Sequence, residues 1–252
     1  MHSPLPCFLC ALVVTLACTL CGCGIEEYLY FYPPTAKTTP IISVTPLEFD
    51  HHSSNSSTYF RGYDIFYLLV DKDNTEFLKK CSSQIDALIG SRSPSQTMEA
   101  IKSLGFVQLV GLYSDSGTYR PCNNVPLFPI ATVDVSKSIS FTINLNSINV
   151  DEESTVSLNI DTSSYEDYPS IVRRNSFDDS LKEYRRFSDF TPDDKSNGGD
   201  TAFLGDSVPQ HVLLRGYIIG YGRTSGFSDV FSDPIRIGDT GSNDTWEAVA
   251  LP

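Results

Sequence analysis

Residues 212 to 221 read VLLRGYIIGY and residues 63 to 70 read YDIFYLLV, two stretches dominated by aliphatic and aromatic side chains. Such residues fit the pleated, buried surface of a β-sheet, so both stretches predict strands. The segments Ile41 to Val44, Leu47 to Asp50 and Phe106 to Tyr113 are similarly rich in β-branched and aromatic residues and predict further strands.

Two more segments show strict alternation. From residue 139 to 145 and from 156 to 160, an apolar side chain follows every polar one. This period of two is typical of a strand with one buried face. Seven or more short strands with turn residues between them predict a mainly β protein and favour an antiparallel sandwich. The glycines at 220, 222 and 226 predict a hairpin turn.

Two helices are expected between strands, as an insertion at about 74–105. In Glu76 to Ile89, apolar residues recur every three or four positions, and Asn74 is a suitable cap. The next helix begins with a capping-box signature at residues 93 to 96, with proline at its first position, and Gly105 ends it. The acidic segment Asp71 to Glu76 is better explained as a helix start than as a calcium loop.

The charge balance excludes one class of partner. The chain has 252 residues, with 18 Lys and Arg against 31 Asp and Glu, a net charge of −13. A nucleic-acid groove needs clustered cations, so no nucleic-acid partner is expected. Residues 151–200 hold 13 acidic and 6 basic residues. This acidic excursion is interpreted as a solvated, partly ordered loop system, with a cation-binding face as the alternative.

The first residues form a separate element. Residues 1–22 contain no Lys, Arg, Asp or Glu, and residues 8 to 20 are apolar. Thirteen residues make a helix of about 20 Å, shorter than the hydrocarbon core of about 30 Å. This pattern predicts the apolar region of a signal peptide. It ends in Leu20-Cys21-Gly22-Cys23, with a small residue directly before a cysteine.

The tetrapeptide resembles the lipobox of bacterial lipoproteins. The resemblance implies that residues 1–22 are a lipoprotein signal peptide cut after Gly22. It also implies that Cys23 is the lipid attachment site, with diacylglycerol on its sulfur and often palmitate or another acyl chain on its amine. Gly24, by analogy with enterobacterial sorting, favours the outer membrane, and the periplasmic and surface faces stay open. The alternatives are an ordinary cleavable signal and a buried apolar helix.

Two cysteines remain after the signal peptide and the lipidated residue. Cys81 and Cys122 would close a disulfide loop worth about 4 kcal/mol outside the cytoplasm. Two buried free thiols are the alternative, because sequence separation does not give the distance between the two residues. Their spacing does not suit a zinc site.

Two separated segments are similar to fibronectin type III domains. Residues 62–67, GYDIFY, look like the third strand of that family, and residues 211–238 are similar to its last hairpin. The resemblance implies an elaborated fibronectin III or immunoglobulin-like sandwich over 41–239. The remaining parts would be a tether at 23–40, whose aromatics rest at the membrane interface or on the domain, and a tail at 240–252. Members of this family are more often binding or spacer modules than enzymes.

No residue pattern predicts a cofactor or a catalytic site. His51-His52 is a weak candidate for a metal site, because neighbouring strand residues point to opposite faces. Asp193 to Asp200 offers carboxylates to a cation but has the composition of a turn, and no nucleophile elbow is present. We expect a membrane-anchored, non-catalytic binding or scaffolding module of the bacterial cell envelope, with an envelope or extracellular protein as possible partner. The alternatives are an envelope hydrolase with an unrecognised site, and a cation or small-molecule receptor that uses the acidic loops.

Overall fold

The computed structural model describes residues 29–37, 47–55, 58–115, 118–121, 126–130, 139–144, 155–160, 163–165, 170–172, 177–178, 183–184, 199–205, 207, 209, 211–237 and 246–250. Cys23, Cys122 and the strand predicted at 41–44 lie outside these residues. Among the described residues, no helix is long and apolar enough to span a bilayer.

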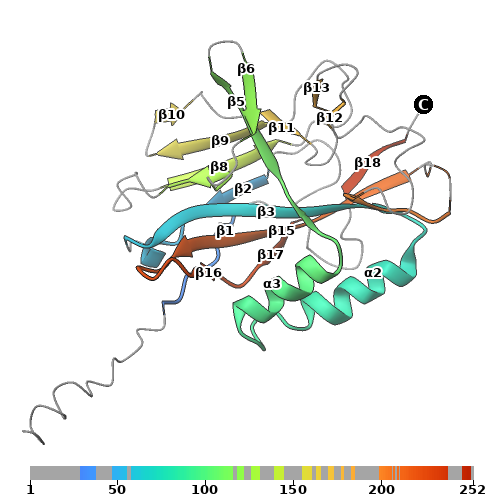
Figure 1. The fold of residues 1–252 in the computed structure, drawn as a ribbon, viewed down its shortest axis with the longest axis horizontal. Coiled ribbons are helices and arrows are strands. Elements are labelled where there is room, and N and C mark those ends of the chain that lie inside the picture. The colour runs from blue at the N-terminus through green and yellow to red at the C-terminus, as the bar shows by residue number, and fades with distance from the viewer. Residues whose placement is uncertain are drawn as a thin grey trace, which may run out of the picture.

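The protein is mainly β, with antiparallel sheets and two helices (Figure 1). The first sheet has eight strands in the order β1-β2-β8-β9-β11-β5-β6, with β10 paired to β9. Its strands are β1 (Thr35–Ala36), β2 (Leu47–Asp50), β5 (Val110–Asp115), β6 (Thr118–Pro121), β8 (Ile139–Asn144), β9 (Thr155–Ile160), β10 (Ser163–Tyr165) and β11 (Ser170–Val172). Strands β12 (Phe177–Asp178) and β13 (Glu183–Tyr184) form a separate pair.

The second sheet also has eight strands and holds the order β14-β3-β15-β16, with β17 and β18 on β15 and with β4 and β7 on β3. The β14–β3 pair is parallel and the others are antiparallel. Its strands are β3 (Phe60–Asp71), β4 (Val107–Gln108), β7 (Phe128–Pro129), β14 (Thr201–Ala202), β15 (His211–Arg223), β16 (Asp229–Phe231), β17 (Ile235–Ile237) and β18 (Trp246–Ala250).

The strands predicted at 47–50, 63–70, 139–145, 156–160 and 212–221 are confirmed. The segment predicted as one strand from 106 to 113 is instead two, because the chain leaves the second sheet after β4 and joins the first sheet as β5. Leu109 makes the crossing, with its side chain buried and its N–H bonded to the Ile65 carbonyl at 2.7 Å.

Two helices follow β3, as predicted: α2 (Thr75–Cys81), continued by a π-helical turn (Ser82–Asp86), and α3 (Pro94–Ser103). The Asn74 side chain accepts the N–H of Phe77 at 3.2 Å, so the predicted cap is confirmed. The capping box is wrong, because the Ser93 side chain makes no capping hydrogen bond. Pro94, whose ring presets a helical φ, still opens α3.

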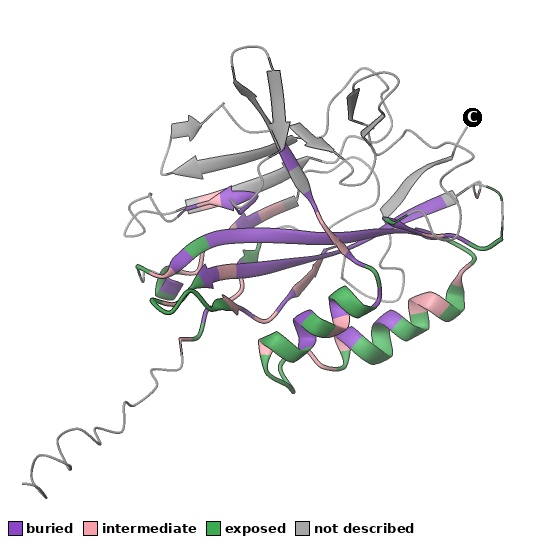
Figure 2. Cartoon of the chain, viewed as in Figure 1, coloured by how far each residue is buried: buried purple, intermediate pink, exposed green. Residues whose placement is uncertain are grey.

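Strands β3 and β15 form the centre of the second sheet and are buried on both faces (Figure 2). Alternate β3 residues such as Tyr63 and Tyr67 join a core with Phe49 of the first sheet. The intervening residues, including Phe66 and Leu68, pack instead against the helices. The second sheet therefore lies between the first sheet and the helical layer.

Part of the predicted tether packs against this core. Phe31 is 1% exposed, and its ring lies 5.1 Å from that of Phe60. The side chain of Asn55, in a 3-10 turn (Ser53–Asn55), binds the backbone N–H of Tyr32 at 2.7 Å and its carbonyl at 2.6 Å. Of the two locations expected for the aromatic residues of the tether, the Phe31 side chain therefore takes the one on the domain.

The hairpin predicted from the glycines is confirmed between β15 and β16, but the glycines have two separate roles. Gly226 lies in the turn, whereas Gly220 and Gly222 lie within β15. A Cβ at Gly222 would collide with the Phe31 ring and with the Tyr59 carbonyl. Gly222 is therefore required for the close approach of Phe31 to the sheet.

Gly222→Ala is expected to lower the free energy of unfolding by about 1–3 kcal/mol, because the added methyl group overpacks this contact. Urea denaturation followed by circular dichroism measures the change. Gly226→Ala is the control, since the nearest atom to its Cβ would be Thr224 Oγ1 at 3.7 Å. Equal effects of the two substitutions would contradict the assigned role of Gly222.

Candidate functional site

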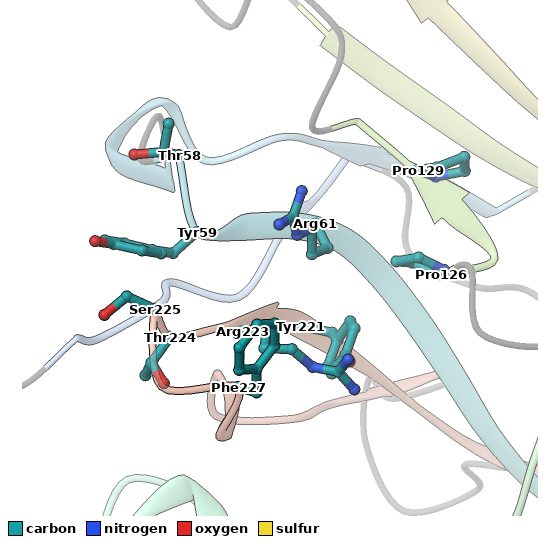
Figure 3. Close-up of a pocket in the computed structure, with 10 residues that line it drawn as sticks. All are labelled: Thr58, Tyr59, Arg61, Pro126, Pro129, Tyr221, Arg223, Thr224, Ser225 and Phe227. Atoms are coloured by element: carbon teal, nitrogen blue, oxygen red, sulfur yellow. The ribbon is translucent and has the colours of Figure 1, made fainter.

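A pocket of about 610 Å³ lies at the end of the second sheet, between the start of β3, the residues before and within β7, and the β15–β16 hairpin (Figure 3). Its lining is aromatic, basic and hydroxyl-bearing: Thr58, Tyr59, Arg61, Pro126, Pro129, Tyr221, Arg223, Thr224, Ser225 and Phe227. In the described part of the chain this lining holds no His, Cys, Asp or Glu side chain.

A β-bulge directs Arg61 outward. Opposite β15, Gly62 pairs with Tyr221 and Phe60 pairs with Gly222, which leaves Arg61 as the extra residue of the bulge. Such an extra residue turns its side chain away from the regular alternation. Arg61 is accordingly the exposed residue of a strand that is otherwise buried. Among the described residues its guanidinium has no ion-pair partner.

Gly62 makes the bulge possible. Its φ of 147° is one that L side chains rarely adopt, and a Cβ there would collide with the Phe128 carbonyl of β7. Glycine meets both demands, since it has no Cβ and tolerates positive φ.

On the other wall, Asp229 holds Tyr221 and Arg223 together. Its Oδ1 accepts hydrogen bonds of 3.0 Å from the Tyr221 hydroxyl and from Nε of Arg223. Burial, together with the bond to Asp229, raises the pKa of Tyr221. Tyr221 is therefore a neutral ring and a hydrogen-bond donor rather than a base at this site.

Phe227 projects from the hairpin turn. Phe227 is 80% exposed, and its backbone has a positive φ of 64°. The turn is closed by bonds from Phe227 N–H to the Thr224 carbonyl and from Thr224 N–H to the Ser228 carbonyl, at 3.0 and 2.9 Å. A positive φ at a bulky residue costs about 1–2 kcal/mol, so these bonds hold an exposed ring in a strained position.

A second polar cluster lies under the helices. Oδ2 of Asp86, at the end of the π-helical turn, accepts bonds of 2.6 Å from Arg215 and from Arg236, and Oδ1 accepts the Tyr217 hydroxyl at 2.8 Å. Arg215 is 3% exposed. Burial raises the pKa of Tyr217, and nearby Arg215 opposes the shift. This network ties the helical layer to β15 and β17.

The predicted lipid and disulfide residues are placed only in part. Cys81 is buried, and burial raises the pKa of its thiol to about 11, so an unpaired Cys81 would stay protonated at neutral pH. Cys122 and Cys23 lie outside the described residues, and both the disulfide and the lipid attachment stay predictions.

The two histidines make separate contacts. The Tyr63 oxygen accepts N–H bonds from the His52 backbone and the Asn55 side chain, so we assign its own hydrogen to Nδ1 of His51 at 3.0 Å. The His52 ring instead stacks on Tyr32, with 4.3 Å between centroids. Among the described residues, no three His, Cys, Asp or Glu side chains form a group that could hold a metal ion.

Each of the two acidic candidates for cation binding has a described carboxylate that is engaged in the fold. Asp71 accepts the N–H of Asp73 at 2.9 Å, next to the helix cap, as expected for a helix start. Asp200 is 1% exposed and accepts the Tyr67 hydroxyl at 2.9 Å. Residues 193–198 lie outside the described residues, so the cation face of the acidic excursion stays a hypothesis.

The pocket was not predicted from the sequence. Two local signals point to it: a charged residue followed by glycine, Arg61-Gly62, inside an apolar strand, and the aromatic Phe227 between turn residues. The Arg61-Gly62 signal is typical of a β-bulge, because a glycine inside a strand often marks one. Neither signal shows that the two segments lie together.

No family model, curated protein or solved structure matches the chain.

Asp86→Asn is expected to lower the free energy of unfolding by about 3 kcal/mol, because it leaves the buried charge of Arg215 without its carboxylate. Urea denaturation at neutral pH measures the loss. The control is Asp229→Asn, which breaks an ion pair whose side chains are both 46% exposed and costs under about 1 kcal/mol. A smaller loss at Asp86 than at Asp229 would show that the buried network does not stabilise the fold.

A pH dependence follows from His51. Burial first, and then the neighbouring His52, lowers the pKa of His51 to about 4, below its usual 6.5. The unfolded chain therefore binds this proton more readily, so stability is complete above about pH 6.5 and declines as the pH falls towards 4. In His51→Gln the decline between these values should be shallower, whereas His52→Gln should retain it. Urea denaturation across this range compares the slopes, and identical slopes in wild type and His51→Gln would refute the assignment.

Proposed function

We propose that the protein is a lipid-anchored component of the bacterial cell envelope whose folded part is a non-catalytic binding module. The pocket between the start of β3 and the β15–β16 hairpin is its binding site. The observation that carries the binding role is the pocket lining, in which ring faces and the outward-directed Arg61 surround an open volume.

The lining has the chemistry of recognition. Tyr59 and Phe227 offer ring faces to an apolar or planar body, and a guanidinium binds carboxylate or phosphate oxygens in a bidentate manner. The ligand class is therefore a molecule that joins an anionic group to an apolar part. Proton transfer and nucleophilic attack need side chains of other kinds, such as a His or carboxylate beside a nucleophile.

We propose that the two sheets form an elaborated sandwich of the fibronectin type III or immunoglobulin-like kind. The two segments that resemble that family, 62–67 and 211–238, fall in β3 and in the β15–β16–β17 region, and β3 pairs with β15. In immunoglobulin-like sandwiches the third strand shares a sheet with the last two. The helices and the parallel strand β14 are elaborations of this plan.

The lipid anchor is supported by the sequence at 20–23 and by the short separation between Cys23 and the folded part of the chain. Leu29 packs against the core that includes Phe31, and five residues separate it from Cys23. Such a short link suits a protein held at a membrane surface.

Cys23→Ala is expected to abolish incorporation of radiolabelled palmitate and to release the protein from the membrane fraction, because the thiol that accepts the lipid is lost. The measurement is labelling of the full chain expressed in a bacterium, followed by membrane fractionation. Cys21→Ala, two residues earlier, is the control and should keep the label. A wild-type protein that takes up no palmitate, or a Cys23→Ala variant that does, would overturn the anchor.

A further inference from the structure

The N-terminal segment and the pocket share one end of the β3–β15 pair. Phe31 packs on Phe60 and against Gly222, which pair with each other across β3 and β15. Each is directly followed in the chain by a pocket residue, Arg61 and Arg223 respectively. The Tyr30 hydroxyl reaches Asp233, just after β16, at 3.4 Å. The segment that leads back to Cys23 is therefore attached beside the pocket.

The link to the anchor is short compared with the fold. Residues 24–28 and the peptide bonds that flank them span at most about 20 Å when fully extended. Strand β3 has 12 residues, or about 40 Å. In an anchored protein, Leu29 cannot lie further than about 20 Å from the Cα of Cys23, so the pocket end stays close to the bilayer.

The same end exposes the side chains that a membrane interface favours. The described residues include four exposed large hydrophobic side chains, and three of them, Tyr30, Tyr32 and Phe227, lie here. The fourth, Leu204, follows β14, which pairs with the far end of β3. Tyr side chains accumulate at the level of lipid headgroups, and exposed Phe side chains insert at the boundary with the acyl chains, so the asymmetry fits a surface that meets a bilayer.

The charge of this end also differs from that of the whole chain. The chain carries −13, whereas the described charged side chains here are balanced: Asp229 pairs with Arg223, Asp233 accepts the Tyr30 hydroxyl, and Arg61 is exposed. Guanidinium groups bind phosphate well. The linker adds two acidic residues, Glu26 and Glu27, so the attraction to lipid must come from Arg61 and the rings.

We propose that the pocket end docks onto the membrane, with Phe227 in the headgroup region and Arg61 on the phosphate of an anionic phospholipid. The ligand of the pocket is then a membrane lipid rather than a soluble molecule or a protein. This inference rests on the proposed lipid anchor, because the length of the link matters only in an anchored chain.

The test uses the full lipidated protein, reconstituted into vesicles that contain phosphatidylglycerol and brominated lipids, which quench tryptophan fluorescence at the membrane. Phe227→Trp adds a probe at the docking end, and Leu204→Trp adds the matched probe at the far end. After subtraction of the signal of Trp246, the only native tryptophan, Trp at 227 should be quenched several-fold more strongly than Trp at 204. Equal quenching of the two probes overturns the proposal.

A second probe and a charge variant complete the test. Ser225→Trp, in the same exposed turn, replaces the first probe if Phe227→Trp does not fold. Adding Arg61→Gln should reduce the quenching, whereas Arg92→Gln, between the helices, should not. If free glycerol 3-phosphate changes the fluorescence at 227 while vesicles do not quench it, the pocket binds a soluble ligand and the docking is wrong.

Failure of the anchor and failure of the docking give different results. Palmitate labelling of the same preparation reports the anchor. A labelled protein without selective quenching at position 227 refutes the docking and leaves the anchor in place. An unlabelled protein whose probe at 227 is still quenched selectively retains the docking and refutes the anchor.

Discussion

The antiparallel pairing of β3 with β15 is the constraint on which the other parts depend. Both strands are buried on both faces, so they need a layer on each side: the first sheet with Phe31 on one, the two helices on the other. Inside this centre the Tyr67 hydroxyl is hydrogen-bonded to Asp200, and the Arg215 guanidinium is paired with Asp86. Because an unpaired buried polar group is costly, each of these bonds also determines which element packs where.

The bulge at the end of this pairing creates the candidate site. One extra residue lets Phe60 face the core while Arg61 faces the pocket, and Gly62 supplies the required backbone conformation. On the partner strand, Gly222 leaves room for Phe31. A regular ladder would have placed an alternating side chain at each of these positions. The pocket and the attachment of the N-terminal segment thus have the same local origin.

Much of the fold was accessible from the sequence, because strand alternation, helix periodicity, the Asn74 cap and the Gly105 stop are local signals. The change of sheet at Leu109 was not, since a continuous apolar run does not record its partners. The bulge depends on the pairing of residues about 160 positions apart. The burial of Phe31 could not be predicted either, because its neighbours Tyr30 and Tyr32 are also aromatic and yet exposed. The pocket was missed for the same reason: it exists only once Arg61 and Phe227 are brought together.

The grip on the N-terminal segment has a structural consequence for the proposed anchored protein. Asn55 holds the backbone of Tyr32 from both sides and also binds the Tyr63 hydroxyl, which in turn meets His51. The N-terminal segment is thus attached to both central strands, to β3 through Phe60 and Asn55 and to β15 through Gly222. Since β3 also carries Arg61, the docked segment and the pocket are held by the same strand, and in the proposed anchored protein the chain would enter the fold beside the pocket.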